Sequence, residues 1–355
     1  MPLDARAVLS GNADPLAAII ALRAEFLPRL MTRFNTSDVR RRLGLYAGER
    51  IPENERNLTD VRTRIGVIIE YELARLSNDL LREDGINDLF WTYVVANRFP
   101  DLEIRDMAGR RGLRFEVKTL QSIAEEKSAN FDTLKKDINP QTDFVVVFLW
   151  EWLYDGAEVA WDRAPHLIEA FIFHAASLAE LRDTYWLNKP PSDLGDGLQG
   201  FDLRYAVNCK DGEYHQEEGN YGKLLRIWQD DFPYQPVSNP LIEDAKQAYY
   251  VFKDQVVTAG FQCLARYHLP KLTGKREVEA LHADDEAESV IGYSVGDTAL
   301  VLGRFVSPSD INAIMKADGL KRLYVLTDKY QWTKYEMQRN SAVKTGSGKK
   351  PKLLA

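Results

Sequence analysis

Residues 102–120 read LEIRDMAGRRGLRFEVKTL, and this stretch decides the fold that we expect for the chain. Leu102–Met107 and Leu113–Leu120 are two strand-like runs, and the turn between them, Ala108–Gly112, contains two glycines. Glycines in a short connection between two strands are typical of a β-hairpin. The sequence therefore predicts two antiparallel strands joined at residues 108–112.

The hairpin carries three charged residues that we expect to share one small space. On a strand, Glu116 and Lys118 point to the same face and Val117 points to the other. Asp106 ends the first strand, so its carboxylate is expected to converge on the same edge. Mg²⁺ takes one or two carboxylates and keeps several waters. Bound there, it would stabilise charge on a phosphodiester and lower the pKa of a water that Lys118 orients.

The pattern of a carboxylate two residues before a lysine is weak by itself. The sequence repeats it at Glu125–Lys127 and Asp244–Lys246, both in helix-like surroundings where residues i and i+2 do not face each other. Only the copy at 116–118 lies on an apolar strand with an aspartate upstream. The alternative interpretation is a surface strand with a Glu–Lys pair.

Helices and buried strands are predicted on both sides of the hairpin. A helix begins at Asn57 or Thr59 and ends at Gly85, a second runs from Asn87 to Pro100 with Phe90 and Trp91, and a polar helix covers 122–137. In the first of these helices, apolar residues recur at helical spacing: Val61, Ile65, Ile68, Ile69, Leu73, Leu76 and Leu80. The run DFVVVFLWEW (143–152) predicts a strand covered on both faces, and 166–175 predicts another strand, followed by a helix to Trp186. We expect an α/β or α+β fold with a mixed central sheet flanked by helices.

The sequence changes character after Lys189. A loop rich in Pro, Gly and Asp is followed by a hairpin turning at Asp211–Gly212. Further on we expect a helix over 242–258, an acidic stretch over 275–289, a short helix from Ser307 to Gly319 and a strand over 323–327. Gly195–Gly200 fits GxGxxG, but a proline-rich loop precedes it and a strand pattern follows, so we expect no nucleotide cofactor.

The helix before the hairpin reads Arg64-Ile-Gly66-Val-Ile-Ile-Glu70-Tyr-Glu72-Leu. Together with Asp106-Met-Ala-Gly and Phe115-Glu116-Val-Lys118, it resembles the PD-(D/E)xK nuclease superfamily, with the order and spacing of archaeal Holliday-junction resolvases. The resemblance covers residues 57–152 and implies a restriction-endonuclease-like core. It also implies that Asp106, Glu116 and the Val117 carbonyl bind Mg²⁺, that Lys118 activates or positions water, and that Glu70 joins the metal site directly or through water.

Two departures from the family pattern leave alternatives open. The proline of the family name is Pro100, followed by Asp101, so Asp101 is a rival for Asp106. Because Asp101 precedes the strand, we expect it to lie too far from Glu116. In helical phase Glu72 falls inside the apolar stripe and Glu70 at its margin, so Glu72 is the alternative to Glu70.

The resemblance and the length together predict a sequence-specific type II restriction endonuclease from the prokaryotic cytoplasm. It would act on double-stranded DNA as a two-fold homodimer. The expected regions are an arginine-rich helical segment (1–56), the catalytic core (57–188) and an added region (189–355) for recognition or dimerisation. The alternatives are a structure-selective repair nuclease or junction resolvase, and a non-catalytic DNA-binding protein with a degenerate core.

Charge and composition narrow the possible functions. The chain has 355 residues, a net charge of −7, 45% hydrophobic residues and two cysteines. These values exclude wholesale disorder, a generally polycationic binder and a disulfide framework, and no apolar run is long enough to span a membrane. DNA contacts therefore need a local basic surface, for which the candidates are Arg40, Arg41, Arg42, Arg110, Arg111, Lys210, Asn220, Lys223 and Arg226.

Overall fold

The computed structural model divides the chain into two compact units. Unit 1 comprises Met1–Gln121 and Lys127–Lys253, and unit 2 comprises Ser122–Glu126 and Asp254–Ala355. Each unit contains a mixed sheet with helices, so the fold is α+β. The domain boundaries expected at residues 56 and 188 stay predictions. The structure describes residues 4–37, 59–94, 99–122, 131, 133, 135–154, 163–182, 238–263, 289–295, 298–302, 304–327, 331–339 and 341–349.

Short helices begin unit 1, as the sequence predicts. They are α1 (Ala5–Leu9), α2 (Pro15–Ala21), the π-helical turn η1 (Leu22–Phe26) and α3 (Leu27–Thr36). Aspartates cap the N-termini of α1 and α2: the Asp4 side chain accepts a hydrogen bond from Arg6 N, and the Asp14 side chain accepts one from Ala17 N. Their buried faces join the hydrophobic core of the central sheet.

The long helix α5 (Thr59–Glu83) confirms the helix predicted before the hairpin. Ile65, Ile69 and Leu73 are buried along the predicted stripe, and Gly85 ends the helix with a φ of 72°. Ile68 was expected in this stripe but is 38% exposed. The buried stripe is therefore narrower than the sequence suggests, and one flank of the helix carries exposed apolar residues.

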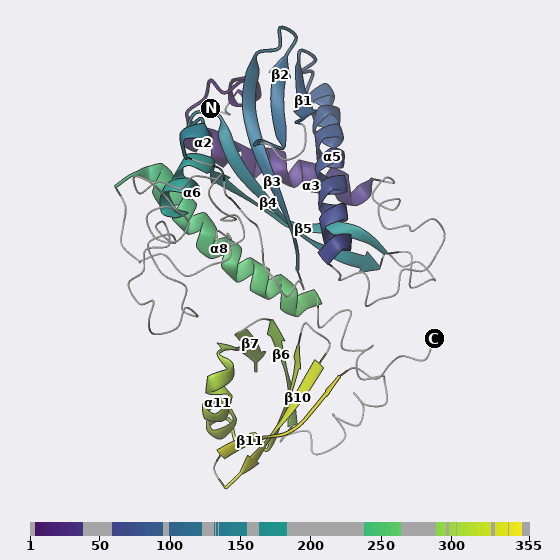
Figure 1. The fold of residues 1–355 in the computed structure, drawn as a ribbon, viewed down its shortest axis with the longest axis vertical. Coiled ribbons are helices and arrows are strands. Elements are labelled where there is room, and N and C mark those ends of the chain that lie inside the picture. The colour runs from purple at the N-terminus through teal and green to yellow at the C-terminus, as the bar shows by residue number, and fades with distance from the viewer. Residues whose placement is uncertain are drawn as a thin grey trace, which may run out of the picture. The chain divides into compact units, whose positions relative to one another are not determined.

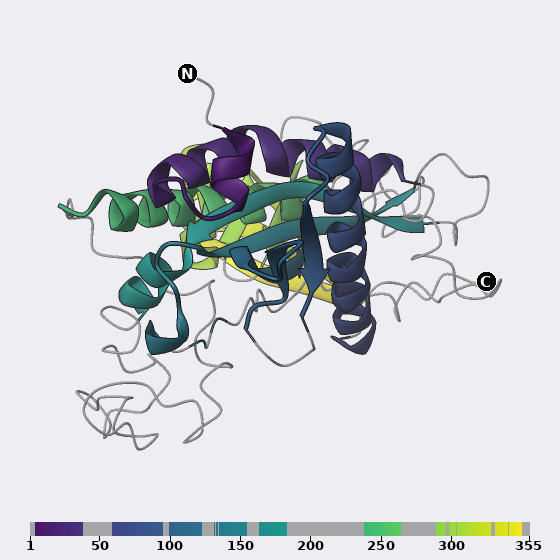
Figure 2. The same cartoon turned by 90° about the horizontal axis from the view of Figure 1, so that it is seen from above.

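The central sheet has five strands in the order β1-β2-β3-β4-β5 (Figures 1 and 2). All neighbours are antiparallel except β3 and β4, which are parallel. The strands are β1 (Leu89–Tyr93), β2 (Leu102–Asp106), β3 (Arg111–Gln121), β4 (Asp143–Tyr154) and β5 (Arg163–His174). The predicted hairpin and both later strands are confirmed.

The helix predicted from Asn87 is wrong, because Leu89–Tyr93 forms the edge strand β1. The side chain of Asn78 in α5 binds this strand as a neighbouring backbone would. Its Nδ2 donates to Trp91 O at 2.8 Å, and its Oδ1 accepts from Trp91 N at 2.8 Å. Aromatic and β-branched residues favour strands, and this tertiary contact adds to that preference.

Strand β4 lies in the middle of the core. Phe144–Trp150 are at most 1% exposed, which confirms a strand covered on both faces. Helix α3 packs on β5, and α5 packs on β1 and β3 (Figure 2). The other described helices are the 3₁₀ turn η2 (Lys135–Asp137), α6 (Ala175–Leu181) and α8 (Pro240–Cys263), whose residues up to Lys253 belong to unit 1. Helix α8 confirms the helix expected over 242–258.

Unit 2 contains a six-stranded sheet in the order β11-β10-β9-β6-β7-β8. Helix α11 (Ile311–Ala317) follows the 3₁₀ turn η9 (Pro308–Asp310) and packs with Leu323 and Val325 in a separate core. The predicted short helix and the predicted strand at 323–327 are confirmed. The strands are β6 (Ser289–Val295), β7 (Thr298–Val301), β8 (Arg304–Val306), β9 (Arg322–Thr327), β10 (Gln331–Gln338) and β11 (Ser341–Lys349).

Several predictions fall outside the described residues. They include the loop from Lys189, the GxGxxG match, the hairpin at Asp211–Gly212, nearly all of the acidic stretch 275–289 and most of the helix expected over 122–137. Seven candidate DNA contacts also fall there: Arg40, Arg41, Arg42, Lys210, Asn220, Lys223 and Arg226. Among the described helices, none is both long and apolar enough to cross a membrane.

Candidate functional site

Strand β3 is longer than the strand beside it. β2 pairs with β3 only between Arg111 and Phe115, whereas β4 pairs with β3 from Arg114 to Gln121. From Glu116 onward, β3 therefore continues beyond the first residue of β2, and its backbone has no partner in β2. Backbone N–H groups at such a position need another acceptor.

Asp101, the residue just before β2, supplies that acceptor. Its backbone N–H donates to Phe115 O at 3.0 Å, and its carboxylate Oδ2 accepts from Val117 N at 2.7 Å. The N–H and C=O of one residue in an antiparallel strand point to the same side. The Val117 carbonyl therefore points to the side on which the Asp101 carboxylate lies.

Glu116 and Lys118 form the ion pair that their spacing predicts. Lys118 Nζ lies 2.6 Å from Glu116 Oε1. The pair is not a solvated surface pair, since Glu116 is only 8% exposed and the Lys118 side chain 23%. This burial contradicts the interpretation of 116–118 as a surface strand.

Glu70 of α5 completes this group of charges. One turn earlier, Gly66 lies against β3 so closely that a Cβ there would be 2.7 Å from Thr119 Oγ1. This close approach brings the half-buried Glu70 toward Lys118 and Asp101. Burial, followed by the Asp101 carboxylate, raises the pKa of Glu70 to about 8, although Lys118 acts in the opposite direction.

We refer to Glu70, Asp101, Glu116 and Lys118 as the Lys118 cluster. Burial alone would lower the pKa of Lys118, but the carboxylates of Glu116, Asp101 and Glu70 more than offset it and hold this pKa above its ordinary value. Burial raises the pKa of Asp101, against the opposing effects of Lys118 and the Val117 N–H. The cluster thus holds a charged lysine among three acidic side chains, of which Glu70 keeps its proton at neutral pH in the absence of metal.

Asp106 does not join the cluster, which corrects the expectation that it meets Glu116. It lies at the hairpin turn, where its backbone N–H donates to Arg110 O. Its Oδ1 accepts from Ala108 N at 2.9 Å and from Arg110 N at 2.8 Å, and its Oδ2 accepts from Arg110 Nε at 2.6 Å. The backbone and side-chain hydrogen bonds from Arg110 lower the pKa of Asp106. Its carboxylate holds the turn.

The register of the hairpin explains this difference. Leu102 pairs with Phe115, which places Asp101 beside Glu116, whereas Arg105 pairs with Arg111. The expectation that Asp101 lies too far from Glu116 is therefore wrong. Counting residue pairs outward from the turn would have separated Asp106 from Glu116, but only the bulge between Glu103 and Arg105, which shifts the register by one residue, brings Asp101 opposite Glu116.

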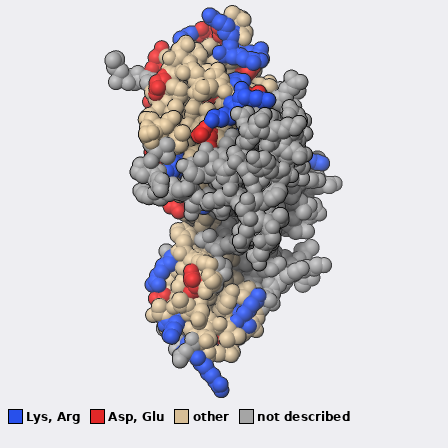
Figure 3. All heavy atoms as spheres, turned by 60° about the vertical axis from the view of Figure 1, so that its left-hand side comes forward, with Lys and Arg blue, Asp and Glu red and all other residues tan. Residues whose placement is uncertain are grey.

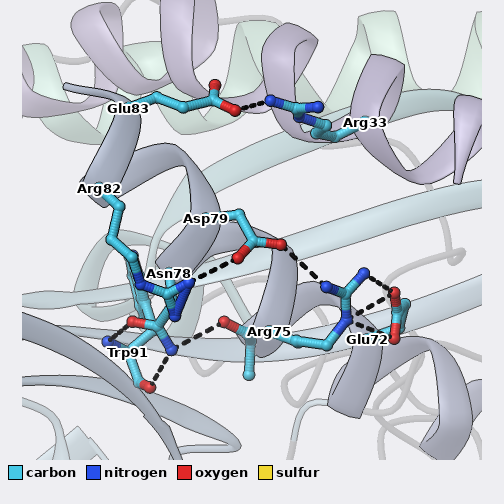
Figure 4. Close-up of polar contacts among 9 residues, drawn as sticks. Arg33, Glu72, Arg75, Asn78, Asp79, Arg82, Glu83 and Trp91 are labelled. Carbon is cyan, nitrogen blue, oxygen red and sulfur yellow. Dashed lines mark hydrogen bonds and ion pairs between the residues drawn. The ribbon is translucent and has the colours of Figure 1, made fainter.

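Glu72 is buried but takes part in a different interaction (Figure 4). Its Oε1 accepts from Arg75 Nε at 3.0 Å, and Arg75 Nη1 also donates to Asp79 at 2.8 Å. Asp79 in turn pairs with Arg82 at 2.7 Å. Of the two glutamates that the sequence left open, the structure brings Glu70 to the cluster and joins Glu72 to this chain of ion pairs.

Most described arginines of the candidate basic surfaces face acidic partners. In the N-terminal segment, Arg23 pairs with Asp244, Arg29 with Asp84 and Arg33 with Glu83. At the hairpin, Arg110 pairs with Asp106 and Arg111 with Glu103, with side chains 84% and 62% exposed. Figure 3 shows Lys and Arg side chains beside Asp and Glu side chains at this end of unit 1. DNA contacts by Arg110 and Arg111 stay predictions.

The Lys118 cluster offers the hard oxygen donors that suit Mg²⁺. Within the described ranges no three His, Cys, Asp or Glu side chains are gathered to hold a metal ion. Asp101, Glu116 and the Val117 carbonyl still fit Mg²⁺, because it takes one or two carboxylates and keeps several waters. The raised pKa values of Glu70 and Asp101 are consistent with this fit, because a cation would favour the ionised forms.

The chemistry of this cluster is the basis for inferring a function. It combines acidic side chains, a charged lysine and a stretch of β3 that β2 does not pair with, at the point where β3 extends beyond β2. Comparisons with models of known protein families, with curated proteins and with solved structures gave no match for this chain.

Proposed function

We propose that this protein is a Mg²⁺-dependent nuclease that hydrolyses phosphodiester bonds of double-stranded DNA. The observation that carries the proposal is the Lys118 cluster, in which Lys118 Nζ lies 2.6 Å from Glu116 Oε1 and Asp101 binds the backbone between them. Three acidic side chains around one lysine cannot all ionise without a large cost in the absence of a ligand, and the raised pKa of Glu70 reflects that cost. A divalent cation and a phosphate would balance these charges.

The order of elements supports this proposal. Helix α5, the β2–β3 hairpin and the parallel strand β4 follow one another as the resemblance to the PD-(D/E)xK superfamily implies. With Asp101 in place of Asp106, the motif becomes Pro100-Asp101 followed by Glu116-Val-Lys118. The restriction-endonuclease-like core is thus part of the proposal.

Each residue of the cluster has a task in this reaction. Asp101, Glu116 and the Val117 carbonyl would hold the metal. When bound, Mg²⁺ supplies charge stabilisation at the phosphate and a lower pKa for water. Lys118, fixed by Glu116, would orient the attacking water or offset charge that develops on the phosphate oxygens. Glu70 would accept a hydrogen bond or a proton at the edge of this group.

The charge of the C-terminal segment supports a polyanionic substrate. Residues 289–355 contain 11 Lys and Arg and 5 Asp and Glu, a net charge of +6, although the whole chain carries −7. Clustered basic residues contact phosphates by releasing condensed counterions. We propose that this segment helps a homodimer to hold DNA, as in a type II restriction enzyme.

The test is digestion of plasmid and phage DNA by the full-length protein, with Mg²⁺ or with EDTA. We expect Mg²⁺-dependent cleavage, which Glu116→Gln and Lys118→Ala abolish and the matched control Glu72→Gln retains. Discrete fragments indicate sequence specificity, and a preference for branched DNA indicates a structure-selective nuclease instead. Binding without cleavage, or cleavage by both cluster variants, contradicts the proposal.

A further inference from the structure

Two tyrosines form a stacked pair outside the Lys118 cluster. The rings of Tyr71 in α5 and Tyr93 in β1 lie 4.0 Å apart between centroids with an interplanar angle of 20°. Tyr71 is 55% exposed, and its helical neighbours Val67 and Ile68 are 42% and 38% exposed. Residues three and four apart share one helix face, so Tyr71 is the centre of an exposed apolar patch.

This stack lies directly beside the cluster. Tyr71 follows Glu70 in α5, and Tyr93 pairs with Leu102, the residue after Asp101. The next residue, Val94, donates its N–H to Asp101 O at 2.8 Å. Tyr93 also lies within the electrostatic field of the cluster, because burial and then the Glu70 carboxylate raise its pKa.

The geometry of the stack favours a flat ligand. One face of the Tyr71 ring rests on Tyr93, which holds the ring in place, and the residue is still 55% exposed. Aromatic rings held in this way stack on nucleobases with little dependence on sequence. A phosphate bound at the Lys118 cluster would bring its own nucleosides to this part of the surface, since they are covalently attached to it.

We propose that Tyr71, supported by Tyr93, stacks on an unstacked nucleobase of the DNA strand that is cut. This inference rests on the proposed nuclease function and names its substrate more closely. Inside a duplex, neighbouring bases cover the faces of every base. The base must therefore be unpaired in the substrate, as at a gap or a single-stranded end, or be flipped out of a duplex by the protein.

The test measures binding without catalysis. Full-length protein, with Ca²⁺ in place of Mg²⁺ so that a hard cation is present, is titrated with a fluorescent single-stranded oligonucleotide and with the fully paired duplex of the same sequence. The variants are Tyr71→Ala, Tyr71→Leu, which keeps apolar bulk, and Tyr71→Phe, which keeps the ring. Val67→Ala is the matched control on the same helix face, and thermal unfolding checks that each variant is folded.

We expect Ala and Leu at position 71 to weaken binding about tenfold, with Phe and the Val67 control within about twofold of the wild type. If affinity falls only for the single-stranded oligonucleotide, the unpaired base must already be present in the DNA. If affinity falls for both ligands, the protein flips the base out of the duplex. No loss with either ligand, or equal loss for Phe and Leu, overturns the proposal. Because cleavage is not measured, failure of the nuclease proposal is seen separately, in the Glu116 and Lys118 variants.

Discussion

The carboxylate of Asp101 accepts a hydrogen bond from Val117 N at 2.7 Å and so occupies the position of a strand partner for β3. The same residue is bound through its backbone N–H to Phe115 O. Asp101 is therefore hydrogen-bonded to the backbone of the residues before and after Glu116, and its carboxylate is held next to the Glu116–Lys118 pair.

Asp101→Asn is expected to reduce cleavage by a hundredfold or more while the protein stays folded. The amide oxygen of asparagine can still accept from Val117 N, but it lacks the charge that a metal ligand provides. Even residues that only orient metal ligands typically change activity by about 10–100-fold. Steady-state cleavage of a supercoiled plasmid, with circular dichroism of the variant, measures both effects.

Asp106→Asn is the matched control in the same hairpin. Because the Asp106 carboxylate binds only the turn around Arg110, this variant should lower the free energy of unfolding and leave cleavage within a fewfold of the wild type. The reverse pattern, with cleavage lost in Asp106→Asn and kept in Asp101→Asn, would restore Asp106 to the catalytic group.

The comparison of Asp101 and Asp106 indicates what local sequence can predict. Alternation of side chains places Glu116 and Lys118 on one face, and the structure confirms their contact. Convergence between strands depends on register, which the turn sets and the bulge between Glu103 and Arg105 modifies. The helix expected at Phe90 and Trp91 fails for a related reason, because the contact of Asn78 with Trp91 joins residues that only the folded chain brings together.

Glu70 should make stability depend on pH in the absence of metal. Its pKa of about 8 in the folded chain exceeds the ordinary value of 4.5 that applies in the unfolded chain. Between these values the folded state binds the extra proton, so the free energy of unfolding falls as pH rises from 4.5 to about 8. For a half-buried carboxyl in partly screened surroundings we expect a fall of about 1–2 kcal/mol.

Glu70→Gln should remove this fall and be more stable than the wild type at pH 9 but not at pH 4.5. Urea unfolding in EDTA at both values measures the difference. Glu72→Gln, on the same helix, should instead lose stability at pH 9, since Glu72 binds Arg75. Equal losses in the two glutamine variants at pH 9 would show that Glu70 has no raised pKa.

The contact of Gly66 with Thr119 predicts strong coupling between the two positions. Alanine normally stabilises a helix interior by about 1 kcal/mol relative to glycine. Here its Cβ would meet Thr119 Oγ1 at 2.7 Å, so α5 or the threonine must shift. We expect Gly66→Ala to destabilise the protein by about 1 kcal/mol and to lower cleavage by moving Glu70.

In a Thr119→Ala background the same substitution should be neutral or stabilising, which gives a coupling energy of about 1–2 kcal/mol. A double-mutant cycle of urea unfolding measures this value. Additive effects of the two substitutions would mean that the helix does not depend on this contact for its position, and that Gly66 is not needed to bring Glu70 to the cluster.

The basic C-terminal segment predicts how salt affects DNA binding. Arg339 and Lys344 lie exposed at the β10–β11 hairpin. If each contacts a phosphate, then Arg339→Gln and Lys344→Gln should each reduce the slope of log affinity against log salt by about 1. Fluorescence anisotropy of a labelled duplex in EDTA, measured from low to high salt, gives that slope.

Arg29→Gln provides the control, because Arg29 donates to both carboxylate oxygens of Asp84 at 2.8 Å and so has a partner in the protein itself. Its loss should cost at most about 1 kcal/mol of stability and leave the salt slope unchanged. If Arg29→Gln changes the slope and the C-terminal variants do not, the DNA backbone is held by the N-terminal helices. In that case the positive net charge of residues 289–355 does not serve DNA binding.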